Sequence, residues 1–344
     1  MGRERTKVRF GVIGTNYITG KMLAGAKEDE RFVLTAVCSR TRERGEAFVR
    51  EQGLSLGSGG VKVFTSVEEL ASSPLVDAVY VASPNSCHAR QSIVCMKGGK
   101  HVLCEKPLAS NRAEATAMIA TAGQYGVTLM EAMKPTLTPN FLALRENMHR
   151  IGKVRRYFSC YCQYSSRYDE LKKGIVQNAF NPGLSNGGMS DIGVYTVYPM
   201  VVLFGAPKGI EATGLLLPSG TDGEGAVNFL YEEMIATVLY SKIANSTLPT
   251  EIQGEEGTLS LDRINIIGRL GLSAGSGGQV EDLTRRVERN EFYYEVAEFM
   301  DLLLSGKRES SINSHENSWN TIAIVDEVRR QVGVSYPADN SPLM

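Results

Sequence analysis

The sequence lacks the features that mark membrane, secreted and nucleic-acid-binding proteins. No apolar run reaches the roughly 18 residues that a membrane-spanning helix needs. Residues 1–14, MGRERTKVRFGVIG, contain no apolar segment of about 7–15 residues followed by a small-residue cleavage site, so we expect no signal peptide. The 37 Lys and Arg residues and 38 Asp and Glu residues form no basic block, so neither nucleic acid nor an anionic membrane is indicated as a partner.

Cysteine is scarce, with 6 residues in 344 and no CxxC pair. Cys160 and Cys162 would share one face of a strand, but a metal site needs further ligands at suitable spacing. We therefore expect no metal site, and thiols that stay reduced as is typical of a cytoplasmic protein. No Ser-His-Asp or Cys-His set stands in a recognisable context.

The length of 344 residues exceeds what one hydrophobic core usually serves, so we expect two domains. In residues 1–132, apolar runs alternate with helical segments of about 10–15 residues, which is typical of a doubly wound parallel sheet, a Rossmann fold, with helices on both faces. The predicted strands are residues 8–13, 32–39, 61–64, 76–83, 100–105 and 127–132. Ligands of such sheets bind beyond the carboxyl ends of the strands.

Residues 133–344 have a different pattern. One predicted helix is followed by long β-type runs without helices between them, which indicates an α+β domain with a large, mostly antiparallel sheet flanked by helices. These runs are residues 154–165, 209–220, 225–243 and 250–268. We assign substrate binding and dimerisation to this domain. The last predicted helix, residues 316–333, is expected to pack back on the first domain.

The turn after the first strand, GTNYITG, begins where a dinucleotide fingerprint G-x-G-x-x-G would begin. Only the first glycine is kept, because Asn16 and Thr19 take the places of the other two. Asn tolerates positive φ better than most residues, and the following helix N-terminus still presents N–H groups to a pyrophosphate. A plain strand–turn–helix corner is the alternative. The residues of this turn that we assign to dinucleotide binding are Gly14, Thr15, Asn16, Tyr17 and Ile18.

The end of the second predicted strand bears on the choice of nicotinamide cofactor. A carboxylate there would bind the adenosine ribose 2′-hydroxyl of NAD. This sequence instead has Ser39, Arg40 and Arg44, with no acidic residue before Glu43. A hydroxyl beside a guanidinium suits a 2′-phosphate, so the sequence favours NADP over NAD. A solvated basic loop is the alternative.

Two further stretches indicate the chemistry. Residues 81–109 contain VASPN and GGKHVLCEKPLA, and residues 181–207 contain SNGGMSDIGVYTVYP. The first resembles the pattern A-T-P-N-x-x-H…G-K-H-V-x-C-E-K-P of the glucose–fructose oxidoreductase / inositol dehydrogenase family, and the second resembles that family's G-G-x-x-x-D-x-G-x-H-x-x-D. The resemblance extends from about residue 7 to about residue 335, and E-K-P after G-K-H-V is its most specific part. It implies an NAD(P)-dependent oxidoreductase.

The sequence departs from the larger family at two positions. Tyr195 stands where His is usual, and Tyr198 stands where the final Asp is usual. SDIGVY together with MEAM resembles the branch that contains dimeric dihydrodiol dehydrogenase and NADP-dependent D-xylose dehydrogenase, whose members use a Tyr with the Lys of E-K-P. That branch commonly continues EAM with an aromatic residue and an Arg, whereas Lys134-Pro135 follows here. The resemblance therefore does not define the substrate.

Hydride transfer between a secondary alcohol carbon and nicotinamide must be matched by movement of the hydroxyl proton. Tyr195 would move this proton if a nearby ammonium lowers its pKa from about 10. Lys106 would supply that ammonium and donate a hydrogen bond to the developing alkoxide. Asp191 would hold substrate hydroxyls or orient Lys106, or else only complement a helix dipole. If residues 189–204 are helical, Asp191, Tyr195 and Tyr198 lie on one face of that helix. We assign Tyr198 to packing.

By the same resemblance, residues at the ends of the fourth and fifth strands contact the cofactor. Asn85 would contact the nicotinamide ribose or ring, and Glu105 would bind ribose hydroxyls or simply pair with a Lys. His88 would flank the cofactor or serve as a hydrogen-bonded structural residue. The resemblance also suggests a cis bond between Lys106 and Pro107. The full set is Ser83, Pro84, Asn85, His88, Glu105 and Lys106.

These observations favour a dehydrogenase or reductase that moves a hydride between NADP or NAD and a secondary alcohol or carbonyl of a sugar, polyol or diol. A nucleotide-binding sensor without turnover is the alternative, motivated by the altered glycine loop, and a reductase of an imine or a linear pigment is a third. One face of the predicted antiparallel sheet has no helix to cover it, which indicates a homodimer or higher homo-oligomer through that sheet.

Overall fold

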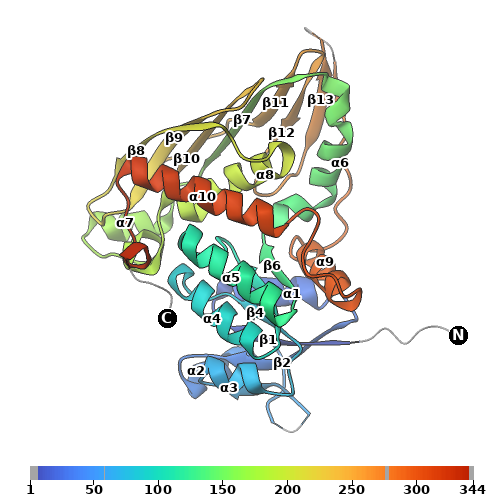
Figure 1. Cartoon of the computed structure of the whole chain (residues 1–344), viewed down its shortest axis with the longest axis vertical. Helices are drawn as coiled ribbons and strands as arrows, with labels where there is room; N and C mark the ends of the chain where they lie inside the picture. Colours follow the sequence, from blue (N-terminus) through green and yellow to red (C-terminus); the bar gives the residue numbers. More distant parts are fainter. Residues whose placement is uncertain (1–6, 58, 276–278, 341–344) are drawn as a thin grey trace, which may run out of the picture.

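The structure, a computed structural model, describes residues 7–57, 59–275 and 279–340. Its first part forms a six-stranded sheet in the order β3-β2-β1-β4-β5-β6 (Figure 1). All paired strands of this sheet are parallel, which confirms the predicted doubly wound fold. The strands are β1 Val8–Ile13, β2 Phe32–Cys38, β3 Lys62–Phe64, β4 Ala78–Val81, β5 His101–Glu105 and β6 Leu129–Ala132.

The strands of this sheet are apolar on both sides because helices cover both faces. Along β4, Tyr80 packs into one apolar cluster, whereas Val79 and Val81 pack into another. This follows from the alternation of side chains across a strand. The helices between the strands are α1 Tyr17–Ala26, α2 Arg42–Glu51, α3 Val67–Ser72, α4 Asn85–Lys97 and α5 Arg112–Tyr125.

Polar side chains define where these helices begin. The side-chain oxygens of Asn16, Thr41, Ser66 and Asn111 each accept a hydrogen bond from the backbone N–H three residues further on. Such caps satisfy donors that have no partner inside the helix. Gly126, in the left-handed conformation at φ 69°, ends α5. Local sequence thus sets these element boundaries.

The second sheet has eight strands in the order β14-β13-β12-β11-β7-β10-β9-β8. Neighbouring strands are antiparallel except for β7 and β10, which confirms the prediction of a mostly antiparallel sheet. The predicted run 225–243 is in fact the hairpin of β9 and β10. The strands are β7 Val154–Cys162, β8 Gly209–Leu216, β9 Asp222–Leu230, β10 Ile235–Ser241, β11 Thr250–Gly254, β12 Gly257–Leu261, β13 Leu270–Ala274 and β14 Val280–Asp282.

Three helices cover one face of the second sheet, namely α6 (Pro139–Asn147), α8 (Val194–Phe204) and α10 (His315–Val332). Figure 1 shows α10 running between this sheet and α5 of the first part. Short helices complete the described chain: α7 Ser166–Lys172, η1 Lys134–Leu137, η2 Met148–Ile151, η3 Asn178–Phe180, η4 Pro182–Leu184 and η6 Pro337–Asn340.

The two parts of the chain are joined by helices that come late in the sequence. Trp319 of α10 donates its indole N–H to Thr116 of α5 at 2.9 Å. Helix α9, Tyr293–Leu304, packs against the first sheet, where the ring of Phe299 meets that of Phe10 edge-on at 6.0 Å between centroids. The final segments of the chain therefore fix the position of the parallel sheet relative to the second sheet.

Candidate active site

The carboxyl ends of the parallel strands bring the predicted cofactor residues to one edge of the first sheet. Gly14 follows β1, Ser39 follows β2, Ser83 lies just after β4, and Lys106 follows β5. Because all these strands run in the same direction, their ends share the edge at which ligands of such sheets bind. This edge is the candidate site.

The turn between β1 and α1 is closely packed. Gly14 has φ 102°, and a Cβ atom there would lie 2.4 Å from the carbonyl oxygen of Ala82, so no side chain fits. Asn16 replaces the second glycine of the fingerprint and caps α1 by accepting from the N–H of Thr19 at 3.0 Å. Its amide also donates to the Ala82 carbonyl at 2.6 Å. Asn16 therefore ties the turn to β4.

The N-terminus of α1 fits a pyrophosphate. The first N–H groups of any helix have no partner inside the helix and attract anions, and the first turn of α1 contains no acidic side chain. Tyr17 and Ile18, at this end, are 74% and 37% exposed. Exposed apolar side chains beside a helix N-terminus suit a surface that a dinucleotide covers.

The end of β2 has the polar groups predicted for a 2′-phosphate. Ser39 is buried, and Arg40 and Arg44 are exposed. The guanidinium of Arg44 donates from Nε to the hydroxyl of Thr15 at 3.1 Å. This bond places a cation directly beside the β1–α1 turn, where the phosphates of a dinucleotide would lie.

Lys106 lies at the centre of the site. Its Nζ donates to the backbone oxygen of Asp191 at 2.8 Å and to Oδ1 of the same residue at 3.1 Å. It lies 4.9 Å from the centroid of the Tyr195 ring. The peptide bond between Lys106 and Pro107 is cis, as the resemblance suggested. An ammonium has three N–H donors, so one remains for a ligand.

A wide helical turn presents Asp191 to this lysine. Met189–Gly193 form one turn of π-helix (η5) before α8 begins, within the stretch 189–204 for which we considered a helix from the sequence. Asp222 accepts from the N–H groups of Gly188 and Met189 at 2.8 and 2.7 Å and so holds the start of this turn. Turns of this kind are frequent at functional sites.

The expected stripe of three side chains is only partly present. Asp191 and Tyr195 face Lys106, but Tyr198 is fully buried and bonds to the hydroxyl of Ser318 at 3.0 Å. Tyr198 therefore has the packing role that we expected for it.

Burial and charge compete at Tyr195 and Asp191. Burial raises the pKa of Tyr195, and although Lys106 opposes it, the pKa stays above its usual value. Lys106 thus acts to lower the pKa of Tyr195 as expected, but burial raises it by more, and the phenol is protonated at neutral pH. Burial also raises the pKa of Asp191, but the ammoniums of Lys242 and Lys106 outweigh it and hold this pKa well below its usual range. Asp191 is therefore an anion.

Lys242 is a site residue that the sequence reasoning missed. It follows β10 and is 2% exposed, with Nζ 2.7 Å from Oδ2 of Asp191. The one signal was a lysine at the end of the strand run MIATVLYSKI, the same context that drew attention to Lys106.

Glu105 already has protein partners. One carboxylate oxygen accepts from the hydroxyl of Tyr80, and the other accepts from the N–H of Lys106 at 3.2 Å. Burial raises the pKa of Glu105. Lys134, where this sequence departs from the resembling branch, pairs with Glu291, and its charge opposes the rise in the pKa of Glu105. The role of Glu105 toward a ribose stays a prediction.

The residues after β4 bind protein groups. The amide of Asn85 donates to the carbonyl of Ser185 at 2.9 Å. The ring of His88 is buried, with Nδ1 and Nε2 each 2.9 Å from a carbonyl oxygen, those of Pro107 and Ser83. Burial lowers the pKa of His88. These contacts support the structural alternative for His88, because the ring joins the ends of β4 and β5.

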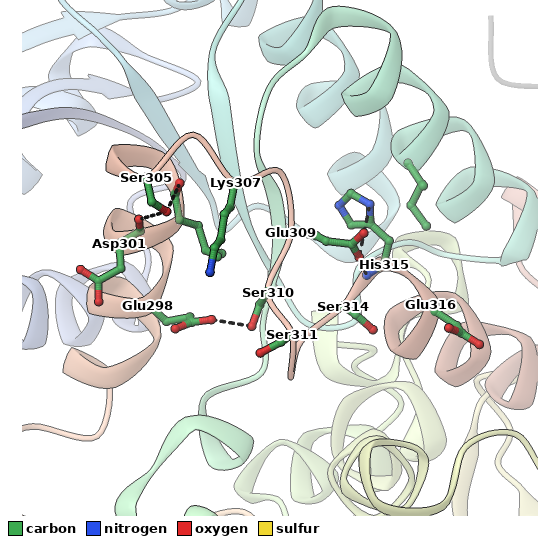
Figure 2. A pocket seen from close by; sticks show the side chains of 12 residues that line it. Glu298, Asp301, Ser305, Lys307, Glu309, Ser310, Ser311, Ser314, His315 and Glu316 are labelled. Atoms are coloured by element: carbon green, nitrogen blue, oxygen red, sulfur yellow. Dashed lines mark hydrogen bonds and ion pairs between the residues drawn. The ribbon is translucent and has the colours of Figure 1, made fainter.

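A cavity of about 930 Å³ lies elsewhere, between the end of α9 and the start of α10 (Figure 2). Its lining has both polar and apolar side chains, among them Glu298, which accepts from Ser310 at 2.6 Å. His315, also in the lining, donates from Nε2 to the carbonyl of Leu129, the first residue of β6. The cavity thus borders the amino end of the parallel sheet, opposite the edge with Lys106, and we assign it no ligand.

Two further properties concern the described residues alone. In residues 7–57, 59–275 and 279–340, no group of three or more His, Cys, Asp or Glu side chains could hold a metal ion. No helix in these ranges is long and apolar enough to cross a membrane.

A doubly wound sheet with a helix N-terminus and a Lys–Asp–Tyr cluster at the same edge defines the class of protein, an oxidoreductase that uses a nicotinamide dinucleotide. The model of an oxidoreductase family with an NAD-binding Rossmann fold, GFO/IDH/MocA, matches residues 8–133. The model of the GFO/IDH/MocA C-terminal domain matches residues 144–260. The chain belongs to this family, which confirms the resemblance seen in the sequence.

Named relatives cover nearly the whole chain. The NADP(+) scyllo-inositol 2-dehydrogenase IolU of Bacillus subtilis is 46% identical over 97% of this chain and 100% of that protein. A trans-1,2-dihydrobenzene-1,2-diol dehydrogenase of Danio rerio is 30% identical over 90% of this chain and 92% of its own length. The structure of KijD10, a 3-ketoreductase from Actinomadura kijaniata in complex with NADP and TDP-benzene, has the same fold, with a TM-score of 0.80 at 23% identity, covering 96% of this chain and 99% of that one.

Proposed function

We propose that this chain is an NADP-dependent oxidoreductase that moves a hydride between the nicotinamide and a secondary alcohol or carbonyl carbon of a polyol, with a cyclic polyol as the leading substrate class. The observation that carries this proposal is the ammonium of Lys106, held by Asp191 and facing the ring of Tyr195 at the edge where a dinucleotide would bind. The relative named as an NADP(+) inositol dehydrogenase supports both the cofactor and the substrate class.

The residues present fit NADP. The N-terminus of α1 would hold the pyrophosphate, and Ser39 and Arg44 would hold the 2′-phosphate. Gly14 leaves room for the backbone to approach the phosphates. When bound, the cofactor supplies or accepts the hydride.

The chain itself would supply proton transfer and orientation. Tyr195, partly buried and protonated, would give its proton to a carbonyl oxygen during reduction and recover it during oxidation. The remaining N–H of Lys106 would bind the same oxygen. Asp191 would accept hydrogen bonds from neighbouring hydroxyls, which suits a substrate that carries several.

Replacing Tyr195 by Phe tests the proposal. We expect kcat with NADP and a polyol such as scyllo-inositol to fall about 10²–10⁴-fold while the Kd for NADPH stays within about twofold, because the phenolic hydroxyl serves the proton and not the cofactor. The assay follows nicotinamide absorbance, and NADPH titration serves as the control for folding. Unchanged kcat in the Phe variant would contradict the role of Tyr195.

The altered glycine loop was the reason for considering a nucleotide-binding sensor without turnover. Asn16 fills that loop as a helix cap with two hydrogen bonds, so the loop gives no reason to expect lost turnover. A wild-type protein that binds NADPH but oxidises no polyol in a broad panel would favour the sensor.

We also propose a homodimer through the open face of the second sheet. In the described chain this face bears no helix, and it exposes Leu230 (56%) and Ile235 (46%) on adjacent strands. The double variant Leu230→Glu, Ile235→Glu should be monomeric by light scattering, whereas Leu304→Glu, which alters an exposed leucine of α9, should leave the mass unchanged. A monomeric wild type would refute the proposal.

The predicted cytoplasmic location also remains a proposal. All six cysteines are free thiols, as in a reducing compartment. Fractionation of the source cells would test it.

A further inference from the structure

The ammonium of Lys242 is surrounded by groups of the protein that occupy its N–H donors. Its Nζ donates to Oδ2 of Asp191 at 2.7 Å and to the carbonyl of Ala179 at 2.5 Å. It also lies 4.6 Å from the centroid of the Phe180 ring, whose face attracts a cation. An ammonium has three N–H groups, so none remains for a ligand. Lys242 therefore acts on the site through Asp191 and not by touching a substrate.

The backbone of Lys242 is fixed as firmly as its side chain. Its N–H donates to the carbonyl of Gly223 at 2.8 Å, and its own carbonyl accepts from the N–H of Ser165 at 2.9 Å. Both bonds extend the pairing of β10 with its neighbours in the sheet. An ammonium on a residue whose backbone is held at the end of a strand in this way keeps its position when ligands enter.

The charges around Asp191 do not cancel. One carboxylate lies between two ammoniums, with Lys106 at 3.1 Å from Oδ1 and Lys242 at 2.7 Å from Oδ2. At Asp191 itself two cations therefore face one anion, while the carboxyl of Glu105 accepts from the backbone N–H of Lys106. Without Lys242, Asp191 would compensate Lys106 alone, and the site would lose one positive charge. Burial of the cluster strengthens the effect, because charges interact more strongly away from water.

We propose that Lys242 is a positioning residue that compensates Asp191, so that the charge of Lys106 remains available to the oxygen of the reacting alcohol or carbonyl. The inference rests on the proposed function. The charged and titratable groups that act on Tyr195 in the described structure include Lys106, Glu105, Tyr161, Asp191 and Tyr80. Lys242 affects these groups through its direct partner, the carboxylate of Asp191.

The test uses Lys242→Met, which removes the charge at similar length, and Lys242→Arg, which keeps it. Lys242→Gln is the second charge-free variant, since it keeps a donor for the carbonyl of Ala179. Lys100→Met is the matched control, because Lys100 is also partly buried and donates to a carbonyl, that of Ser73 at 2.7 Å, but at the amino end of β5.

Three quantities are measured. With Lys242→Met we expect kcat for NADP-linked polyol oxidation to fall about 10–100-fold with little change in KM for NADP. The ascending, acid-side limb of the pH–rate profile, where Tyr195 must accept the proton, should move up by about one pH unit, because a cation that favours phenolate and alkoxide is lost. We also expect the ratio of the Kd for NADP to the Kd for NADPH to fall about tenfold, since a positive charge disfavours the cationic oxidised ring. This ratio needs no turnover. Lys242→Arg should restore the pH profile and the ratio, and Lys100→Met should match wild type.

Three outcomes would overturn the inference. The first is that Lys242→Met or Lys242→Gln matches wild type in kcat, pH profile and affinity ratio. The second is a fall in kcat with an unmoved profile and ratio, or failure of both charge-free variants to fold, because either result marks a structural role only. The third is a wild type that neither binds NADPH nor oxidises a polyol. Only the third outcome also removes the proposed function, which Tyr195→Phe tests separately.

Discussion

Glu131 in β6 makes the stability of this protein depend on pH near neutrality. Its side chain is 1% exposed, and Oε1 accepts from the N–H of Leu108 at 2.9 Å. Burial raises the pKa of Glu131 from its ordinary 4.5 to about 7, with Glu105 adding to the rise and Lys106 opposing it. The folded protein therefore holds this proton more tightly than the unfolded chain.

The sign and size of the effect follow from linkage. Below the unfolded pKa both states are protonated, and stability is unaffected. As pH rises through the folded pKa, the unfolded chain gains more by ionising, so stability is lost. With about 1.4 kcal/mol for each pKa unit, the rise to about 7 corresponds to a total loss near 3 kcal/mol. About 2.5 kcal/mol of this falls between pH 5 and pH 8.

Glu131→Gln isolates this contribution, because the amide keeps an oxygen for the N–H of Leu108 but cannot ionise. We expect the free energy of unfolding of Glu131→Gln minus that of wild type to increase by about 2.5 kcal/mol from pH 5 to pH 8. Denaturation can be followed by the fluorescence of Trp319, the one tryptophan of the sequence. Glu288→Gln, at a side chain that is 72% exposed, is the control and should show a constant difference. Parallel curves for wild type and Glu131→Gln from pH 5 to pH 8 would refute the reasoning.

Two further predictions concern the cofactor edge. Arg44→Ala should raise the Kd for NADPH about tenfold or more and leave that for NADH unchanged, because the guanidinium is assigned to the 2′-phosphate; equal losses for both cofactors, measured by fluorescence titration, would contradict the assignment. Gly14→Ala should abolish the thermal shift that NADPH produces, because the added Cβ would lie 2.4 Å from the Ala82 carbonyl and distort the turn; a normal NADPH shift would show that the turn tolerates a side chain.

Local sequence patterns predicted the framework of the site well. Apolar runs alternating with helices indicated the parallel sheet, and the ends of its strands placed Gly14, Ser39 and Lys106 at one edge. These features depend on neighbours in the chain and on the common direction of the strands, so a short window of sequence contains them.

The parts that the sequence did not predict depend on distant partners. Helical spacing of 3.6 residues put Tyr198 on the same stripe as Asp191, but Asp222 binds the N–H groups of Gly188 and Met189 and the helix starts with a wide turn. No window around residue 190 contains that partner. The same holds for α9, a late segment that packs against β1 of the first sheet.

The proposed role of Lys242 is connected with the tyrosine at this site. The family position of Tyr195 usually holds a His, whose ordinary pKa of about 6.5 already suits proton transfer at neutral pH. A phenol starts from about 10 and, in this site, burial raises its pKa further. One lysine paired with one aspartate would leave a neutral pair and little field at the reacting oxygen. In the proposal above, Lys242 would compensate Asp191, since its Nζ lies 2.7 Å from Oδ2. In the proposed mechanism the tyrosine would thus use a second cation at the aspartate, which the fold places at the end of β10.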